Sequence, residues 1–290
     1  LTRRNGLWGL SRSSPISGTG KVKVASISWL VPFVDKAHRS DFDGALAADL
    51  MLAGTLEKPS VNGQLTGQSL RFSWAEQGLK LRNGTLDAEL SGDRLLIKHF
   101  RIHGGEGHLA ITGYAGWRDK RPDISLELKA DRLQVLTRPD RKLVSSGDAQ
   151  SSVKHNTMYL QGNLKADRAL IELPKEEMPR RSPDVVVIGR PPEQKTTPLA
   201  IHLALQLDLG NQFYLKGRGL DAQLTGSLKV MADPHEYPKA YGSIRVVKGH
   251  YAAYGQRLQI EHGIVDFRGP LDNPGLDILA MRKNQPVEAG

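Results

Sequence analysis

Apolar and polar residues alternate with a period of two over most of this 290-residue chain. In the clearest segment, 199–209, His202, Gln206 and Asp208 fall between six aliphatic residues at odd positions: Leu199, Ile201, Leu203, Leu205, Leu207 and Leu209. Successive side chains of a β-strand point to opposite faces, so all six belong to one face. The pattern predicts half-buried strands with one apolar and one polar face each.

Similar segments begin at Leu46 and recur up to residue 282, separated every 8 to 14 residues by clusters of turn-forming Gly, Pro, Asn and Ser. Asn83-Gly84, between two apolar segments, is typical of a hairpin turn. This spacing predicts an all-β protein built as a long, meandering antiparallel sheet. At most one short helix is expected, near residues 29–38, where Pro32 limits its length.

Four strands share a sub-pattern in which a glycine stands between two apolar residues on the same face. The four glycines are Gly54, Gly63, Gly162 and Gly226. Glycine removes side-chain bulk from that face, so the sheet can curl tightly toward it. A glycine that merely ends a strand would explain any one case, but four cases in the same phase favour a curved sheet.

Composition narrows the function classes. The chain has no cysteine, which excludes disulfides, thiolate catalysis and cysteine zinc sites. Its net charge of +9 would suit a nucleic acid or an anionic membrane. However, the basic residues, such as Lys21, Lys129 and Lys216, are spread along polar strand positions, and no run of five occurs. This distribution favours a solvated outer face and charged sheet edges over nucleic-acid binding.

The sequence offers little for catalysis or metal binding. His99, His103 and His108 cluster near Glu106, but their spacing matches no zinc signature. Gly18 to Lys21 lacks the first glycine and the Ser/Thr of a phosphate-binding loop. We therefore expect no enzyme activity, no metal site and no cofactor.

The expected organisation is one sheet with two irregular segments. Residues 1–15 are basic and aperiodic, which predicts a frayed N-terminal end. Residues 16–290 are predicted to form a single β-sheet fragment of a longer protein, interrupted by a proline-rich irregular loop at 174–198. No apolar run of 18 residues occurs, so any membrane anchor is expected upstream of Leu1.

Several motifs resemble one family. The segments YAAYGQRLQIE at 251–261 and FRGPLDNPGLDI at 267–278 are similar to a signature of the TamB family, the inner-membrane-anchored component of the translocation and assembly module in Gram-negative bacteria. SPDVVVIG at 182–189 and FYLKGRGLDAQLTGSL at 213–228 resemble it as well. The resemblance is specific over about 180–282 and looser, but collinear, before that.

This resemblance implies a periplasmic sheet folded lengthwise into a taco or U-shaped trough with a hydrophobic interior. It also implies kinship with bridge-type lipid-transfer proteins and a partnership with the outer-membrane barrel TamA. Together with the alternation, it predicts a lipid groove lined by Leu46, Leu50, Leu52, Leu65, Leu109, Ile111, Ile124, Leu126, Leu128, Leu160, Leu164, Leu199, Ile201, Leu203, Leu205, Leu207, Leu209, Leu224, Leu228, Val230, Ile244, Val246, Leu258 and Ile260.

Three functions fit these predictions. The first is a conduit that carries phospholipid acyl chains between the inner and outer membranes, because an aliphatic groove shelters chains but performs no chemistry. The second is a scaffold that guides outer-membrane barrel proteins by strand addition. The third is a β-solenoid adhesin or spacer whose interior is filled by its own side chains.

Overall fold

The computed structural model describes the chain except for residues 1, 5–6, 10, 32–39, 119–120, 155, 175–199, 235, 254 and 283–290. The strands of the described part are β1 (Thr2–Arg4), β2 (Leu7–Gly9), β3 (Gly18–Val24), β4 (Ser40–Gly54), β5 (Pro59–Trp74), β6 (Leu79–Ser91), β7 (Arg94–Gly104), β8 (Gly107–Arg118), β9 (Arg121–Thr137), β10 (Arg141–Lys154), β11 (Thr157–Glu172), β12 (Ala200–Asp208), β13 (Phe213–Gly217), β14 (Leu220–Ala232), β15 (Lys239–Ala253), β16 (Gln256–Pro270) and β17 (Gly275–Met281). Two single 3₁₀ turns, η1 (Ser28–Leu30) and η2 (Ala75–Gln77), accompany them.

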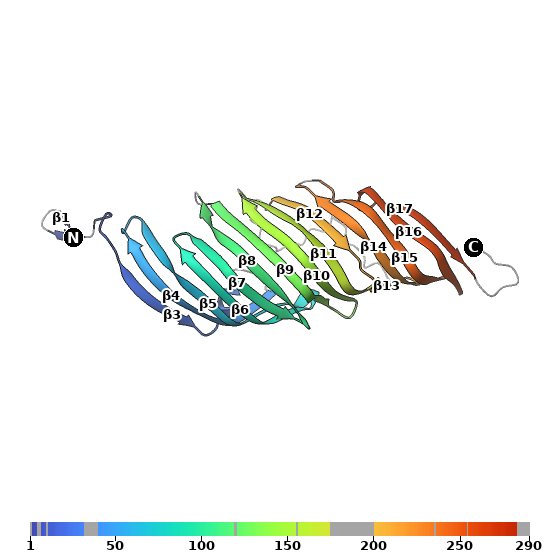
Figure 1. The fold of residues 1–290 in the computed structure, drawn as a ribbon, viewed down its shortest axis with the longest axis horizontal. Helices are drawn as coiled ribbons and strands as arrows, with labels where there is room; N and C mark the ends of the chain where they lie inside the picture. The colour runs from blue at the N-terminus through green and yellow to red at the C-terminus, as the bar shows by residue number, and fades with distance from the viewer. Residues whose placement is uncertain are drawn as a thin grey trace, which may run out of the picture.

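All strands from β3 onward join one 15-stranded sheet, while β1 and β2 form a separate pair. Figure 1 shows the strands side by side in a long slanted row from β3 to β17. The all-β curved sheet predicted from the alternation is thus confirmed. Of the helix expected at 29–38, the structure shows the short turn η1, and residues 32–39 lie outside the described part.

The sheet is antiparallel except at one junction. Strands β12 and β13 both run parallel to β11, with Thr157 beside Ala200 and Ala169 beside Phe213. They act as one strand that is interrupted between Asp208 and Phe213, and both pair with β14 on their other side. Parallel neighbours need a long connection that returns to the start of the strand. The proline-rich loop predicted at 174–198 falls in this connection, of which residues 175–199 lie outside the described part.

In most strand pairs, the pairing register shifts at a similar position along the strands. The shifts at 67–72 in β5, 82–85 in β6, 143–147 in β10 and 260–262 in β16 belong to a row of irregularities that crosses the sheet. A β-bulge bends its strand and increases the local twist. A row of bulges therefore bends the sheet along its long axis.

Asn83 lies in this row, so the hairpin turn predicted at Asn83-Gly84 is wrong. Both residues are inside β6, where Asn83 adopts a left-handed conformation with φ 53°. Ser69 and Arg132 have the same kind of conformation in β5 and β9. Asn-Gly suits positive φ wherever it occurs, and a bulge uses that property as readily as a turn does.

The sheet is a single layer with a shallow core. Among the described residues, no large side chain is completely buried, and four of the ten buried hydrophobic residues are alanines. The main cluster joins Leu209, Ala222 and Leu224, with Phe213 and Val246 packed against it. Because no second layer of the described residues covers the sheet, its apolar face is the feature that needs a functional explanation.

The described residues of the N-terminal end form backbone hydrogen bonds. Within residues 1–15, β1 and β2 pair with each other, and the backbone of Arg12 and Ser14 accepts hydrogen bonds from Glu57 and Leu56 in the β4–β5 turn. Pro15 forms an isolated bridge with Thr55. Backbone pairing of this kind carries no side-chain periodicity, so the sequence pattern gave no sign of it.

Candidate functional site: the apolar face

Strand register places the predicted groove residues on one face of the sheet. Residues opposite each other in a ladder share a face, and examples are the pairs Leu52 with Val61, Ile111 with Leu128, and Leu160 with Leu203. The same-face relationship continues from β4 to β16 and includes all the predicted lining residues that the structure describes. Leu199 lies outside the described residues.

Most of these side chains are half-buried, although no second layer covers them in the part of the chain that the structure describes. Leu203, Leu205 and Leu207 are half-buried, whereas Gln206 and Asp208 on the other face of β12 are exposed. Aliphatic side chains shield one another when a sheet bends toward their face. Leu52 and Ile201 depart from this trend, with exposed fractions of 37% and 48%. The apolar face is therefore accessible but locally packed.

The predicted lining residues include none from β6 and β7, although these two strands carry the same face across the middle of the sheet. In β7, Ile97 pairs with Gly113 and Phe100 pairs with Ile111, so two residues three apart share one face. The bulge between them breaks the period-two pattern. Pairing with neighbouring strands adds the following residues to the face: Leu86, Leu90, Leu95, Ile97, Phe100 and Ile102.

The sheet curls sharply over the β7–β8 hairpin. A Cβ built on Gly104 would lie 2.7 Å from Leu81 in β6 and 2.9 Å from Leu133 in β9. These two strands flank the hairpin and are not neighbours in the sheet. The side chains of Leu81 and Leu133 thus meet above the hairpin end, and they narrow the apolar face at this point.

Glycines permit part of this curvature. Gly226 in β14 has φ +138°, and a Cβ there would overlap the carbonyl oxygen of Ser243 in β15. Gly226 is one of the four glycines predicted to allow curling. A backbone conformation reserved for glycine at this position agrees with that interpretation.

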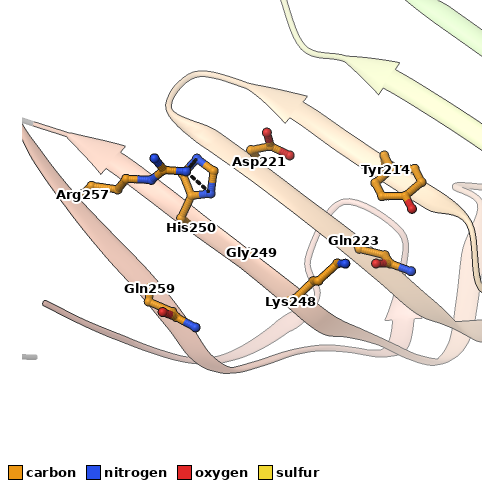
Figure 2. Close-up of a pocket in the computed structure, with 8 residues that line it drawn as sticks. All are labelled: Tyr214, Asp221, Gln223, Lys248, Gly249, His250, Arg257 and Gln259. Atoms are coloured by element: carbon orange, nitrogen blue, oxygen red, sulfur yellow. Dashed lines mark hydrogen bonds between the residues drawn. The ribbon is translucent and has the colours of Figure 1, made fainter. Parts of the chain in front are cut away.

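The opposite face is polar and charged. A pocket of about 610 Å³ lies on this face. Its lining includes Asp221, Gln223 and Lys248 (Figure 2). In this pocket, Nη2 of Arg257 lies 2.9 Å from Nε2 and 3.1 Å from Nδ1 of His250. The pocket has no aliphatic lining, so it is suited to water and small polar groups rather than to acyl chains.

The histidine cluster lies at the β7–β8 hairpin. His103 and His108 are opposite each other, with ring centroids 6.0 Å apart. His99 pairs with Asp87 instead, further along the strand. The three histidines are therefore spread over two ladders rather than directed at one point.

One carboxylate has a strongly shifted acidity. Asp43 in β4 accepts a hydrogen bond of 2.7 Å from Ser26, and it also bonds to the backbone of Gly44 and to Arg71. The hydrogen bond from Ser26 is the largest cause that lowers the pKa of Asp43 from 3.8 to about 2. These contacts tie the start of the β3–β4 connection to β4 and β5, so they act on the sheet rather than on the apolar face.

Helices of the described part include none that is long and apolar enough to cross a membrane.

Comparisons with known proteins point to one family. A family model described as the TamB C-terminal domain matches residues 98–290, more than half of the chain. A curated relative, the translocation and assembly module subunit TamB of Haemophilus influenzae, is 26% identical over 262 residues. That alignment covers 85% of this chain and 20% of the relative, so the chain spans about a fifth of that protein's length. On the strength of the family match, this chain belongs to the TamB family.

Proposed function

We propose that this chain is a segment of a periplasmic hydrophobic conduit for phospholipid acyl chains. The observation that carries the proposal is the single apolar face, which continues without a change of side from β4 to β16. From β4 to β16, twelve strands follow one another along the sheet, so eleven spacings of about 4.8 Å give a path of about 50 Å. Because the chain spans about a fifth of its curated relative, this path would be one part of a longer conduit.

The energetics favour such a path. An acyl chain of about sixteen carbons that crosses water loses on the order of 10 kcal/mol of apolar burial, at about 0.8 kcal/mol for each CH₂. A continuous aliphatic face replaces that burial at every step. Similar side chains along the face provide no deep energy minimum, so a lipid can advance from strand to strand. The proposal assigns no catalytic step and no cofactor to the chain.

Family membership supports the cellular setting of the proposal. The curated relative is named as a subunit of the translocation and assembly module. We place the chain in the periplasm of a Gram-negative bacterium, within a longer protein that is anchored in the inner membrane and works with the outer-membrane barrel TamA. In this arrangement, the long axis of the sheet runs between the membranes.

Photocrosslinking tests the conduit directly. A photoreactive residue at Leu203 or Leu205, both half-buried on the apolar face, is expected to crosslink phospholipid, which mass spectrometry detects. The same residue at Ala204, exposed on the other face, serves as the matched control. Leu203→Arg should abolish lipid capture, whereas Ala204→Arg should leave it unchanged. Equal crosslinking from both faces, or none from either, contradicts the conduit.

The exposed apolar side chains of β17 favour a second candidate, a scaffold that accepts barrel strands. Leu276 and Ile278 are 67% and 56% exposed. A strand with exposed apolar side chains can pair with another strand. Crosslinks from Leu279 to an unfolded barrel protein, without lipid crosslinks from Leu203, would favour this candidate over the conduit.

A further inference from the structure

A pocket at the rim of the sheet combines an apolar floor with cationic side chains. It has a volume of about 840 Å³ and lies where the β9–β10 turn, the end of β11 and the β13–β14 turn meet. Four basic residues and two acidic residues line it. The basic ones are Arg138, Arg141, Lys216 and Arg218, and the acidic ones are Asp140 and Glu172. We call it the rim pocket.

The floor of the rim pocket continues the apolar face. Ile171 pairs with Leu215 in β13 and with Arg141 in β10, so all three lie on the same face of the sheet. Leu173 extends this floor, and its N–H donates to the carbonyl oxygen of Lys216 at 2.7 Å. A chain that lies on the apolar face can therefore end in the rim pocket without crossing a polar surface.

Two guanidinium groups are held beside this floor. Nε of Arg138 and Nε of Arg141 donate to the two carboxylate oxygens of Asp140, at 2.9 and 3.1 Å. The side chain of Arg141 is 44% exposed. A guanidinium has five N–H donors, so the bond from Nε leaves the Nη groups of Arg141 for an incoming anion. Arginine matches phosphate oxygens well because its planar fork can donate two parallel hydrogen bonds.

We propose that the rim pocket binds the phosphodiester of an anionic glycerophospholipid whose acyl chains lie on the apolar face. This inference rests on the proposed conduit, and it adds the lipid class and the place of the headgroup. Lys216 also pairs with Asp221 at 3.3 Å, and the remaining excess of basic over acidic lining residues favours a net negative headgroup. The pocket of Figure 2 also contains basic side chains, but it lacks an aliphatic floor and lies on the other face.

Binding of short-chain lipids to the whole 290-residue chain tests the rim pocket. The probes are dioctanoylphosphatidylglycerol, dioctanoylglycerol with the same chains but no phosphate, and inorganic phosphate. The rim variant is R141Q/R218Q, which keeps Arg138 because that residue also bonds to the backbone of Glu76. The control variant is K248Q/R257Q, which removes the same charge from the polar pocket of Figure 2. Circular dichroism establishes that both variants are folded.

The rim variant is expected to weaken phosphatidylglycerol binding about tenfold and to leave dioctanoylglycerol binding unchanged, while the control variant changes neither. If both lipids bind, but the rim variant weakens phosphatidylglycerol binding no more than the control variant does, the assignment of the headgroup to the rim pocket is wrong. The conduit proposal is then unaffected. If neither lipid binds the unaltered chain, the conduit and the rim pocket both fail. Inorganic phosphate that binds as tightly as the lipid overturns the lipid assignment.

Discussion

Nη1 of Arg138 donates a hydrogen bond of 2.6 Å to the backbone carbonyl oxygen of Glu76, 62 residues earlier in the chain. Glu76 lies in η2, before β6, and Arg138 follows β9. Strands β6 and β9 are separated by β7 and β8, so a flat sheet would hold them about 14 Å apart, at three spacings of about 4.8 Å. This bond therefore joins two parts of the sheet that only its curl brings together.

Arg138→Ala is expected to lower the free energy of unfolding by about 1 kcal/mol, the usual net value of one hydrogen bond. It should also speed amide hydrogen exchange at residues 75–81, because the substitution removes a hydrogen bond that holds η2 against the β9–β10 turn. Urea denaturation and exchange mass spectrometry measure the two effects. Arg268→Ala is the control, since the Arg268 side chain is 87% exposed and bonds only locally to Asp266 among the described contacts. Equal effects of the two substitutions would exclude a special role for Arg138.

Gly226→Val should lower the free energy of unfolding by about 2 kcal/mol or more, because valine resists positive φ and its Cβ would overlap the Ser243 carbonyl oxygen. Gly20→Val is the matched control, since Gly20 lies in β3 on the same apolar face and a Cβ there meets nothing within 4 Å. Thermal unfolding followed by circular dichroism compares them. If Gly226→Val is as well tolerated as Gly20→Val, the curvature does not depend on that glycine.

Leu224→Ala removes a side chain from the main buried cluster and is expected to lower the free energy of unfolding by about 2 to 3 kcal/mol. Leu276→Ala removes a leucine that is 67% exposed in β17, and it should change that free energy by less than about 0.5 kcal/mol. Urea denaturation distinguishes them. A cost for Leu276→Ala that approaches that of Leu224→Ala would show that β17 is covered in solution.

Alternation predicted the side of the sheet for residues such as Leu203 and Leu228 because strands without bulges keep a strict period of two. It failed for Ile97 and Phe100, which share a face only through a bulge. The parallel direction of β12 relative to β11 could not be predicted either. The pattern along one strand defines its two faces, but it does not show which strand lies beside it or in which direction that strand runs.

The rim pocket and the contact between Arg138 and Glu76 could not be predicted for a related reason. Both depend on the meeting of segments that are far apart in the sequence, such as the β9–β10 and β13–β14 turns. In the sequence, each of these segments has the composition of an ordinary charged turn. Their arginines acquire a common role only after the sheet has brought the strand ends together.

Acid should weaken the end of the sheet that contains Asp43. The pKa of Asp43 is lowered from 3.8 to about 2 in the folded protein, chiefly by the hydrogen bond from Ser26, so folding favours its charged form. This contribution to stability is fully present above pH 3.8 and is lost as the pH falls toward 2. Asp43→Asn should therefore be less stable than the unaltered chain at pH 6, and the difference should disappear near pH 2. Denaturant titrations from pH 6 to 2 measure it, with Asp49→Asn, an exposed residue of the same strand, as the control. A difference between Asp43→Asn and the unaltered chain that is the same at pH 6 and pH 2 would contradict the role of the Asp43 charge.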